Sequence, residues 1–321
     1  MTLALDTRRA TGDDVPAILH LLRASMNRAE DARFEALFRW KHFENPFGAS
    51  PMWVACDGSR VVAFRTLLRW EFERGGDVLR AVRAVDTATH PDYQGRGLFT
   101  RLTRTALAEL ESEGVRFVFN TPNAKSRPGY LKMGWSTIGR ARACVRASVP
   151  AGALALARNR VPAGHWSEPA TFGMPAEQVL GEVDDALLAT SSDDTRLRTA
   201  ASRAFLRWRY ASAVLPYRAI VSPEGPERGV ALTRVRRRGN AREIVVAAIL
   251  ASADRRARRR LLHEVRRTVR GQADYILGMS PLPGLAPVPF IGPVVTTRDL
   301  SERAPKSIVD FCLTMADIEL F

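Results

Sequence analysis

The sequence has few of the residues that build metal sites and disulfide frameworks. Its 321 residues include three cysteines, which lie far apart at positions 56, 144 and 312. No Cys-X-X-Cys pair occurs, which argues against a disulfide framework and against a zinc ribbon. The five histidines show no His-Glu-X-X-His or other metal-ligand spacing, so we expect no metal.

Long apolar runs and several catalytic motifs are also missing. No stretch reaches the roughly 18 apolar residues that a membrane-spanning helix needs. The first residues, MTLALDTRRATGDD, contain no apolar segment of signal-peptide length. We therefore expect a cytoplasmic protein without a membrane partner. Neither a Gly-X-Ser-X-Gly elbow nor the Gly-Lys-Ser/Thr of a P-loop occurs.

Lysine is scarce, although the formal net charge is +14. It occurs only at positions 41, 125, 132 and 306, so arginine carries nearly all of the positive charge. A preference for arginine over lysine along the whole chain is typical of an effect of genome composition. Binding of an anionic partner is the alternative explanation for the positive charge. The densest arginine cluster opens a predicted helix over 254–270. No aromatic residues interleave with it, so we favour a solvated helical face over a nucleic-acid site.

The first half alternates strands and helices. Apolar periodicity predicts two helices, then a hairpin around Asp57-Gly58, and then a strand over 78–89. A helix follows Gly97 and ends at Gly114, after which come a strand over 115–119 and a short helix ending near Gly134. One or two strands are expected within 135–146. This order predicts an α/β fold, with helices on both faces of a mixed sheet.

The second half repeats this order more weakly. We expect a first domain over 1–148, a linker over 149–175 that is rich in Ala, Pro and Gly, and a second domain over 176–321. The segment 205–210 echoes 37–42, and its Trp208 corresponds to Trp40. We interpret the two tryptophans as core anchors instead of an aromatic substrate wall. Where the first half has Gln-Gly-Arg-Gly, residues 252–256 contain no glycine.

The stretch HPDYQGRGLFTRL, residues 90–102, lies between the strand over 78–89 and the helix that follows. Glycines at such a turn let several backbone N–H groups converge on one spot, and the helix dipole adds positive potential there. A pyrophosphate is the natural ligand. Gly-X-Gly turns are also common in plain strand–helix connections, so the motif alone leaves both interpretations open. A dinucleotide loop would need a third glycine.

Two motifs together resemble the GCN5-related N-acetyltransferase (GNAT) superfamily. Gln94-Gly95-Arg96-Gly97-Leu98-Phe99 resembles the family's Q/R-x-x-G-x-G/A signature for acetyl-CoA, and residues 130–135, YLKMGW, resemble its Y-x-x-x-G-F. The resemblance covers roughly 5–146. It implies a GNAT acyl-CoA N-acyltransferase fold, duplicated in this chain with the second copy lacking the pyrophosphate loop. Phe99 departs from the small final residue of the signature, so its side chain must turn away from the phosphates.

The resemblance also implies a set of site residues. Tyr130 matches the family's tyrosine acid by position, against the alternative of a core tyrosine on a short helix. Asp86 is the candidate general base on the central strand, against the alternative of a surface or hydrogen-bonded carboxylate near a strand end. Asn123 either contacts the cofactor or caps the next helix. The residues expected to bind acetyl-CoA are Thr87, Ala88, Thr89, Gln94, Gly95, Arg96, Gly97, Leu98, Phe99, Thr100, Asn120 and Asn123.

The implied activity is transfer of an acetyl group from acetyl-CoA to a primary amine, with general base and acid assistance. A non-catalytic acyl-CoA-binding regulatory module is the alternative, and nucleic-acid binding through the basic helix over 254–270 is a third hypothesis. The expected partner is a small-molecule or peptide amine, and a homodimer is a further expectation. The sequence does not choose among aminosugars, antibiotics, polyamines, amino acids and protein amines.

Overall fold

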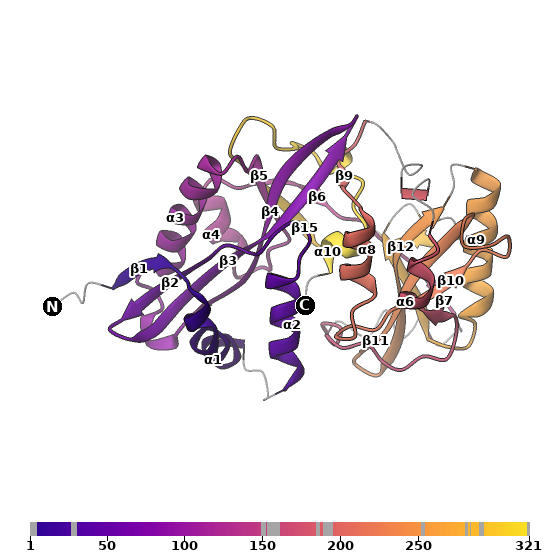
Figure 1. Ribbon diagram of the computed structural model, residues 1–321, viewed down its shortest axis with the longest axis horizontal. Coiled ribbons are helices and arrows are strands. Elements are labelled where there is room, and N and C mark those ends of the chain that lie inside the picture. The colour runs from indigo at the N-terminus through magenta and orange to yellow at the C-terminus, as the bar shows by residue number, and fades with distance from the viewer. Residues whose placement is uncertain are drawn as a thin grey trace. The chain divides into compact units, whose positions relative to one another are not determined.

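The computed structural model describes residues 5–26, 31–148, 152, 161–183, 187–188, 195–251, 254–279, 282, 284–288 and 292–319. They form two compact units, which are coloured along the chain in Figure 1. The first unit contains Met1–Gly139 and Val294–Asp310. The second contains Arg140–Pro293 and Phe311–Phe321. Each unit is built around one mixed sheet.

The sheet of the first unit has the strand order β1-β2-β3-β4-β5-β15-β6. Neighbours are antiparallel from β1 to β4, β4 and β5 are parallel, and β5 and β15 are antiparallel. The strands are β1 (Asp6–Arg9), β2 (Met52–Asp57), β3 (Arg60–Arg74), β4 (Asp77–Thr89), β5 (Phe117–Asn120), β6 (Ser136–Arg140) and β15 (Val294–Asp299).

Helices cover both faces of this sheet (Figure 1). On one face, α1 (Val15–Met26) and α2 (Arg33–Phe43) pack against alternate residues of β2 and β3, such as Val54 and Phe64. On the other face, α3 (Leu98–Ser112) and α4 (Arg127–Lys132) pack against Trp53 and Ala63. The alternation along β3 gives each face its own apolar core, because successive side chains of a strand point to opposite sides.

The second unit has the strand order β14-β7-β13-β12-β11-β10-β8. Again one central pair is parallel, β12 with β13, and the pairs β10–β11, β11–β12 and β13–β7 are antiparallel. The strands are β7 (Ala143–Ala147), β8 (Met174–Pro175), β10 (Arg218–Val221), β11 (Gly229–Arg238), β12 (Ala241–Ala251), β13 (Tyr275–Met279) and β14 (Ala286–Pro287). The helices are α6 (Ala176–Leu180), α8 (Arg203–Tyr210), α9 (Arg255–Thr268) and α10 (Met315–Ile318).

The units do not follow the predicted boundary at residue 148, because the two halves of the chain exchange a strand. From the first half, β7 pairs with β13 of the second sheet, and from the end of the second half, β15 pairs with β5 of the first sheet. β7 and β15 therefore occupy matching places beside the second strand of each parallel pair. Periodicity identifies a strand but not its partner, which is why the predicted domains, 1–148 and 176–321, missed this exchange. Part of the predicted linker, residues 149–151 and 153–160, lies outside the described residues.

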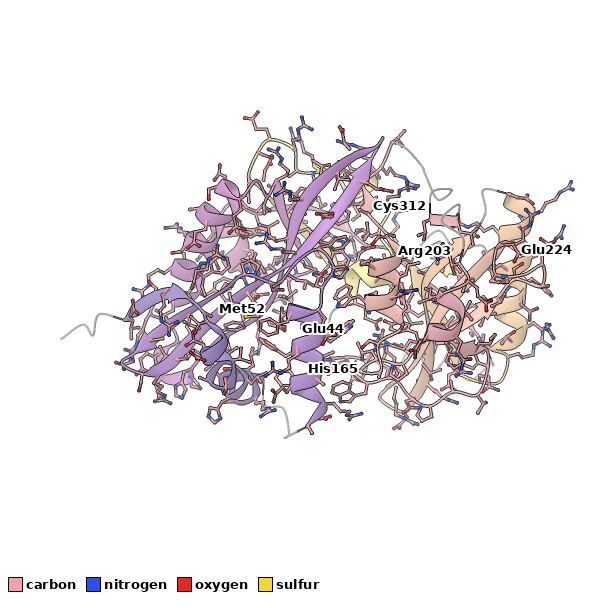
Figure 2. The ribbon with its side chains drawn as sticks, viewed as in Figure 1. Glu44, Met52, His165, Arg203, Glu224 and Cys312 are labelled. Carbon is pink, nitrogen blue, oxygen red and sulfur yellow. The ribbon has the colours of Figure 1, made fainter. Side chains whose placement is uncertain are left out.

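The predicted fold class is confirmed: both sheets are mixed and have the strand order expected of a duplicated fold. Trp40 and Trp208 are both buried, as core anchors should be. In α9, the apolar face formed by Leu261, Leu262 and Val265 is buried, while the arginines at 256, 258, 259 and 260 are exposed. Arg260 pairs with Glu224, which Figure 2 labels beside that helix. None of the described helices is long and apolar enough to cross a membrane.

Candidate active site

The loop between β4 and α3 forms a cradle of backbone N–H groups. Gly95 and Gly97 both have left-handed backbone conformations, with φ of 74° and 73°. A Cβ atom at either position would meet nothing within 4 Å, so the backbone angle requires glycine and the space above it is open. Gly97 is the N-cap of α3, and no side chain caps this end. The first N–H groups of α3 therefore remain available for an anion.

Side chains of the loop make hydrogen bonds and ring contacts that stabilise its conformation. Arg96 donates from Nη2 to the carbonyl oxygen of Asp92 at 2.8 Å, and its guanidinium carbon lies 4.8 Å from the centre of the Tyr93 ring. The Tyr93 hydroxyl donates to the carboxylate of Asp57. Gln94 donates from Nε2 to the carbonyl of Thr89 at 3.3 Å. The Arg96 side chain thus contacts residues that precede it in the chain, Asp92 and Tyr93.

A cavity of about 310 Å³ lies over the cradle. Eight of the predicted cofactor residues line it, and Tyr93 is the ninth lining residue, which the sequence did not single out. The eight are Thr87, Ala88, Thr89, Gln94, Gly95, Gly97, Leu98 and Phe99. The other four predicted cofactor residues, Arg96, Thr100, Asn120 and Asn123, do not belong to its lining.

The two parallel strands beside the cradle separate before they reach it. The β4–β5 ladder joins Ala81–Arg83 to Phe117–Phe119, and within 77–120, all of which is described, it goes no further. Beyond the ladder, residues 84–87 of β4 are only half-buried, although β4 is a central strand. Main-chain groups on this edge of β4 are therefore available to an extended ligand, as on the edge of a sheet.

A β-bulge lies at this part of β4. Arg65 of β3 faces Thr87 while Thr66 faces Val85, so Asp86 is the extra residue without a partner on β3. Such a bulge locally redirects the backbone and its N–H and carbonyl groups. The bulge thus falls between the end of the ladder and the residues of β4 that line the cavity.

Two residues from α2 hold the Asp86 carboxylate. The Lys41 ammonium lies 2.5 Å from Oδ2, and His42 Nε2 lies 2.8 Å from the same oxygen. Because a carboxylate only accepts hydrogen bonds, His42 carries its proton on Nε2 and accepts at Nδ1 from the Ser50 hydroxyl, 2.9 Å away. Burial lowers the pKa of His42, so the ring is neutral at pH 7.

The same contacts change the expectation for Asp86 as a base. Burial alone would raise the pKa of Asp86, but the charge of Lys41 and the hydrogen bond from His42 hold it well below its ordinary value. A general base works best when its pKa is near the working pH. The geometry therefore favours the structural alternative that the sequence left open, a carboxylate that fixes the bulge, over direct proton abstraction.

The predicted acid, Tyr130, lies on α4, is buried and does not belong to the cavity lining. Its hydroxyl accepts a hydrogen bond from Arg65 Nη1 at 2.9 Å, which leaves the phenolic proton available for donation. The Phe99 ring meets the Tyr130 ring edge to face, with centroids 5.4 Å apart, and the Arg65 guanidinium carbon lies 5.3 Å from the Phe99 ring centre. The Phe99 ring thus packs against Tyr130 and Arg65, while the residue is half-buried and also lines the cavity.

Arg65 is a buried cation with unused hydrogen-bonding capacity. Its side chain is fully buried on β3, and its Nε and Nη2 have no hydrogen-bond partner among the described residues. Within the same residues no carboxylate forms an ion pair with it. Burying a charged group costs several kcal/mol of hydration free energy, which a partner of opposite charge normally offsets. A buried arginine without such a partner therefore needs an explanation. Arg65 contacts Phe99 and faces Thr87 across the strand pair, and both of these residues line the cavity, so its charge lies close to the cavity.

The two predicted asparagines take part in local structure. Asn120 is buried, and its Oδ1 accepts from the hydroxyl of Thr296 on the neighbouring strand β15. Asn123 accepts at Oδ1 from the N–H groups of Lys125 and Ser126, at 3.0 and 2.9 Å. Asn123 thus closes the turn that precedes α4, whose N-cap is Ser126, and a contact of Asn123 with the cofactor stays a prediction.

Sequence reasoning missed Arg65, Lys41 and His42. Arg65 carried a usable signal, because it interrupts the apolar run VVAFRTLL, where a charge in a central strand needs an explanation. Lys41 is one of only four lysines in the chain. Nothing in the sequence pairs it with Asp86, because 45 positions separate them and only the packing of α2 on β4 brings them together.

Comparisons with known proteins find a match to most of the first unit. The model of the acetyltransferase (GNAT) domain matches residues 6–138. These residues are therefore similar to that domain, over less than half of the chain. Proteins of this family catalyse acyl transfer, and GNAT acetyltransferases use acetyl-CoA. A comparison with curated protein sequences finds no match.

Solved structures show the same fold over almost the whole chain. A probable N-acyltransferase from Enterococcus faecalis is similar with a TM-score of 0.67 and 13% identity, over 94% of this chain and 73% of that one. A GCN5-related N-acetyltransferase from Anabaena variabilis has a TM-score of 0.65 at 13% identity, covering 93% and 73%. Another from Kribbella flavida has a TM-score of 0.62 at 14% identity, covering 94% and 73%. At these identities the likeness concerns the fold.

Proposed function

We propose that the first unit is an acyl-CoA-dependent N-acyltransferase that transfers an acetyl group from acetyl-CoA to a primary amine. One observation carries the proposal: two left-handed glycines open an uncapped helix below a cavity that the edge of β4 also lines. The GNAT domain match and the fold of the neighbours support acyl transfer in general. The acceptor is a small-molecule or peptide amine.

The residues around the cavity fit the parts of the cofactor. The N–H groups from Gln94 to Thr100 suit a diphosphate, because they surround open space at a helix N-terminus. The free edge of β4 at residues 87–89 suits the amides of a pantetheine arm, which pair with it like an added strand. When bound, acetyl-CoA supplies an activated thioester carbonyl. Backbone N–H groups near the bulge at Asp86 are positioned to polarise that carbonyl.

Proton transfer is assigned to Tyr130 and Arg65. As the amine nitrogen bonds to the carbonyl carbon, the carbon–sulfur bond breaks and the departing sulfur takes the phenolic proton of Tyr130. Arg65 stabilises the resulting phenolate through the hydrogen bond from Nη1. The proton that the amine releases passes to water and finally restores the phenol. Asp86 acts as a positioning residue, because Lys41 and His42 already hold its carboxylate.

Tyr130→Phe tests this assignment. We expect kcat to fall by about two orders of magnitude, the range for loss of a general acid, with an unchanged dissociation constant for acetyl-CoA. The measurement is thiol release from acetyl-CoA with a panel of primary amines, beside calorimetric titration of the cofactor. Tyr217→Phe is a matched control, because Arg209 Nη1 donates to the buried Tyr217 hydroxyl, also at 2.9 Å, in the second unit.

Unchanged turnover in Tyr130→Phe would remove Tyr130 as the acid but leave the cofactor site standing. Acetyl-CoA binding without turnover of any amine by the wild-type chain would support the regulatory-module alternative. Absence of acetyl-CoA binding by the wild-type chain would refute the proposal as a whole. These three outcomes are distinct, since the titration and the turnover assay are independent measurements.

A further inference from the structure

The second unit keeps the backbone features that form the acyl site of the first. Leu232 of β11 faces Ala248 and Thr233 faces Val246, so Ala247 is an unpartnered bulge residue on β12, as Asp86 is on β4. The parallel ladder between β12 and β13 also has three residue pairs and ends at Val245, just before the bulge. By register, residues 246–250 correspond to residues 85–89 of the first unit.

A cavity of about 190 Å³ lies along this part of β12. Residues 246–250 all line it, so it follows the strand edge as the first unit's cavity does along residues 87–89. The other walls are mostly hydrocarbon, from α8, β13 and the segment before α10, and include Phe205, Leu206, Met279, Leu313 and Met315. Ala248 and Ile249 are only half-buried although β12 is a central strand, because the cavity exposes them.

The start of α9 differs from the start of α3 and excludes a phosphate there. Asp254 caps α9 and accepts at its carboxylate from the N–H groups of Arg256 and Ala257, at 2.8 and 3.4 Å. A carboxylate therefore already occupies the position at which the first unit offers free N–H groups. A ligand of the second cavity is held without a diphosphate, and coenzyme A is not the class of molecule that fits.

The charge at this cavity has one sign. Among the described residues, Arg198 and Arg258 are the charged residues of the lining, and none of the described acidic residues contributes to it. Arg258 is exposed on the first turns of α9, so its guanidinium is accessible to a ligand head group. At about 30 Å³ for each group of water or methylene size, the volume accommodates roughly six such groups. Hydrocarbon walls, an arginine and this volume together define the ligand: a short chain with one anionic end.

We propose that the second unit binds a short aliphatic carboxylate in the cavity beside residues 246–250. The chain lies among the apolar side chains, and the carboxylate meets Arg258. The site is separate from the acetyl-CoA site that we propose for the first unit, and it does not depend on that activity. The duplicated fold has thus kept the gap between its parallel strands and changed the ligand class by losing the glycine loop.

Hexanoate is the probe, titrated into the full-length protein by calorimetry at neutral pH. Arg258→Gln should weaken hexanoate binding about ten-fold, as expected for loss of one charge-assisted hydrogen bond. Arg259→Gln is the matched control, because it removes an exposed arginine that does not line the cavity, and it should leave the affinity within about two-fold. Hexylamine, with the same chain and the opposite charge, should bind far more weakly than hexanoate.

Modification of Cys312 by a thiol reagent tests ligand binding in the wild-type protein, without a substitution in the cavity. It is a free, half-buried cysteine that lines the cavity, and Figure 2 labels it beside α8. Cys56 and Cys144 are buried, so a thiol reagent should modify Cys312 first. Hexanoate should slow this modification, and Ala248→Trp, which fills the cavity, should abolish both the protection and the calorimetric signal.

Failure of hexanoate to bind at millimolar concentration would overturn the proposal. So would binding that neither protects Cys312 nor responds to Arg258→Gln, since the ligand would then lie elsewhere. Hexylamine binding as tightly as hexanoate would refute the assignment of a carboxylate. If Ala248→Trp fails to fold, the Cys312 protection and the paired arginine variants still decide the question in the wild-type fold.

Discussion

The two units begin from the same backbone plan and differ in how their central helices start. In both, a bulged strand ends its three-residue parallel ladder and leads toward a helix. In the first unit, Gly97 leaves the N-terminus of α3 without a side-chain cap, whereas Asp254 caps α9 in the second. The N-terminus of α3 is open to an external anion, whereas the carboxylate of Asp254 already occupies the N-terminus of α9. In both units the fold leaves a gap beside the parallel strand pair. We propose that the residues at the start of the following helix determine which ligand binds in this gap.

Buried charge shows a second difference. In the second unit, two buried arginines have carboxylate partners: Arg234 pairs with Glu319 at 2.7 Å, and Arg236 pairs with Glu243 and Glu319. In the first unit, Arg65 is equally buried but has no such partner among the described residues. Paired charges of this kind belong to the structure, whereas for the unpaired Arg65 we propose a role in the chemistry of the neighbouring cavity.

The strand exchange gives the largest expected effect. A fragment of residues 1–148 contains β7, which belongs to the other sheet, and lacks β15, so the edge of β5 stays unpaired. We expect this fragment not to fold cooperatively, because that edge exposes buried strand groups. A fragment in which residues 1–139 are joined by a flexible linker to 294–310 should fold and bind acetyl-CoA. Circular dichroism, thermal unfolding and calorimetric titration distinguish the two.

Cooperative unfolding of the 1–148 fragment with native affinity for acetyl-CoA would show that β15 is dispensable. The exchange would then be a feature of chain connectivity without energetic weight. The linked fragment is the matched control, since it restores the missing strand and omits the second unit.

The buried arginines give the next largest effect. Arg234→Met leaves the buried carboxylate of Glu319 with one fewer cationic partner, and we expect a loss of about 3–5 kcal/mol in the free energy of unfolding. Arg65→Met removes a buried charge that has no carboxylate partner, so we expect the free energy of unfolding to stay the same or to rise. Turnover should nevertheless fall in Arg65→Met. Urea unfolding and the amine acetylation assay measure the two properties. Equal destabilisation by both substitutions would contradict the distinction.

The bulge residues give a third test, since Asp86 and Ala247 occupy the same position in the two units. Asp86→Asn removes the carboxylate that pairs with buried Lys41, and we expect a loss of about 3 kcal/mol in the free energy of unfolding at pH 7. The folded-state pKa of Asp86 is lowered, so its stabilisation is complete above the unfolded-state pKa of about 3.9 and is lost as the pH falls below that value.

Urea titrations of wild type and Asp86→Asn at pH 7, 5 and 3.5 check this sign. The difference in stability should be the same at pH 7 and 5 and smaller at pH 3.5. A difference that grows with acidity would contradict the assignment. The pH profile of kcat/KM tests the base directly: loss of its acidic limb in Asp86→Asn would return Asp86 to the role of general base.

The cradle glycines give the smallest effect on folding and a specific effect on binding. Gly97→Val introduces a β-branched residue at positive φ, and we expect acetyl-CoA to bind about 100-fold more weakly because the N–H cradle is distorted. Gly76→Val is the matched control, since Gly76 also has a positive φ of 83° with nothing within 4 Å, but lies in a hairpin turn away from the cradle. Calorimetric titration compares them. Equal weakening by both would trace the effect to stability instead of the cradle.

The sequence by itself determined the local elements and the cofactor loop of this protein. Spacing of apolar residues predicted α3 and its end at Gly114, and the glycines predicted the turn that the φ angles of Gly95 and Gly97 now explain. The match between residues 205–210 and 37–42 indicated the duplicated fold. These features depend on residues close together in the chain, which is why pattern and propensity were sufficient to find them.

Only the tertiary structure decided which distant residues meet. It joined β15 to β5 across more than half of the chain, brought Lys41 and His42 to Asp86, and placed Arg65 against Tyr130. It also showed that the second unit has a cavity at the equivalent strand edge, which the loss of glycine alone does not predict. Strand partners and side-chain pairs across a sheet are set by packing among remote segments, so no local pattern in the sequence specifies them.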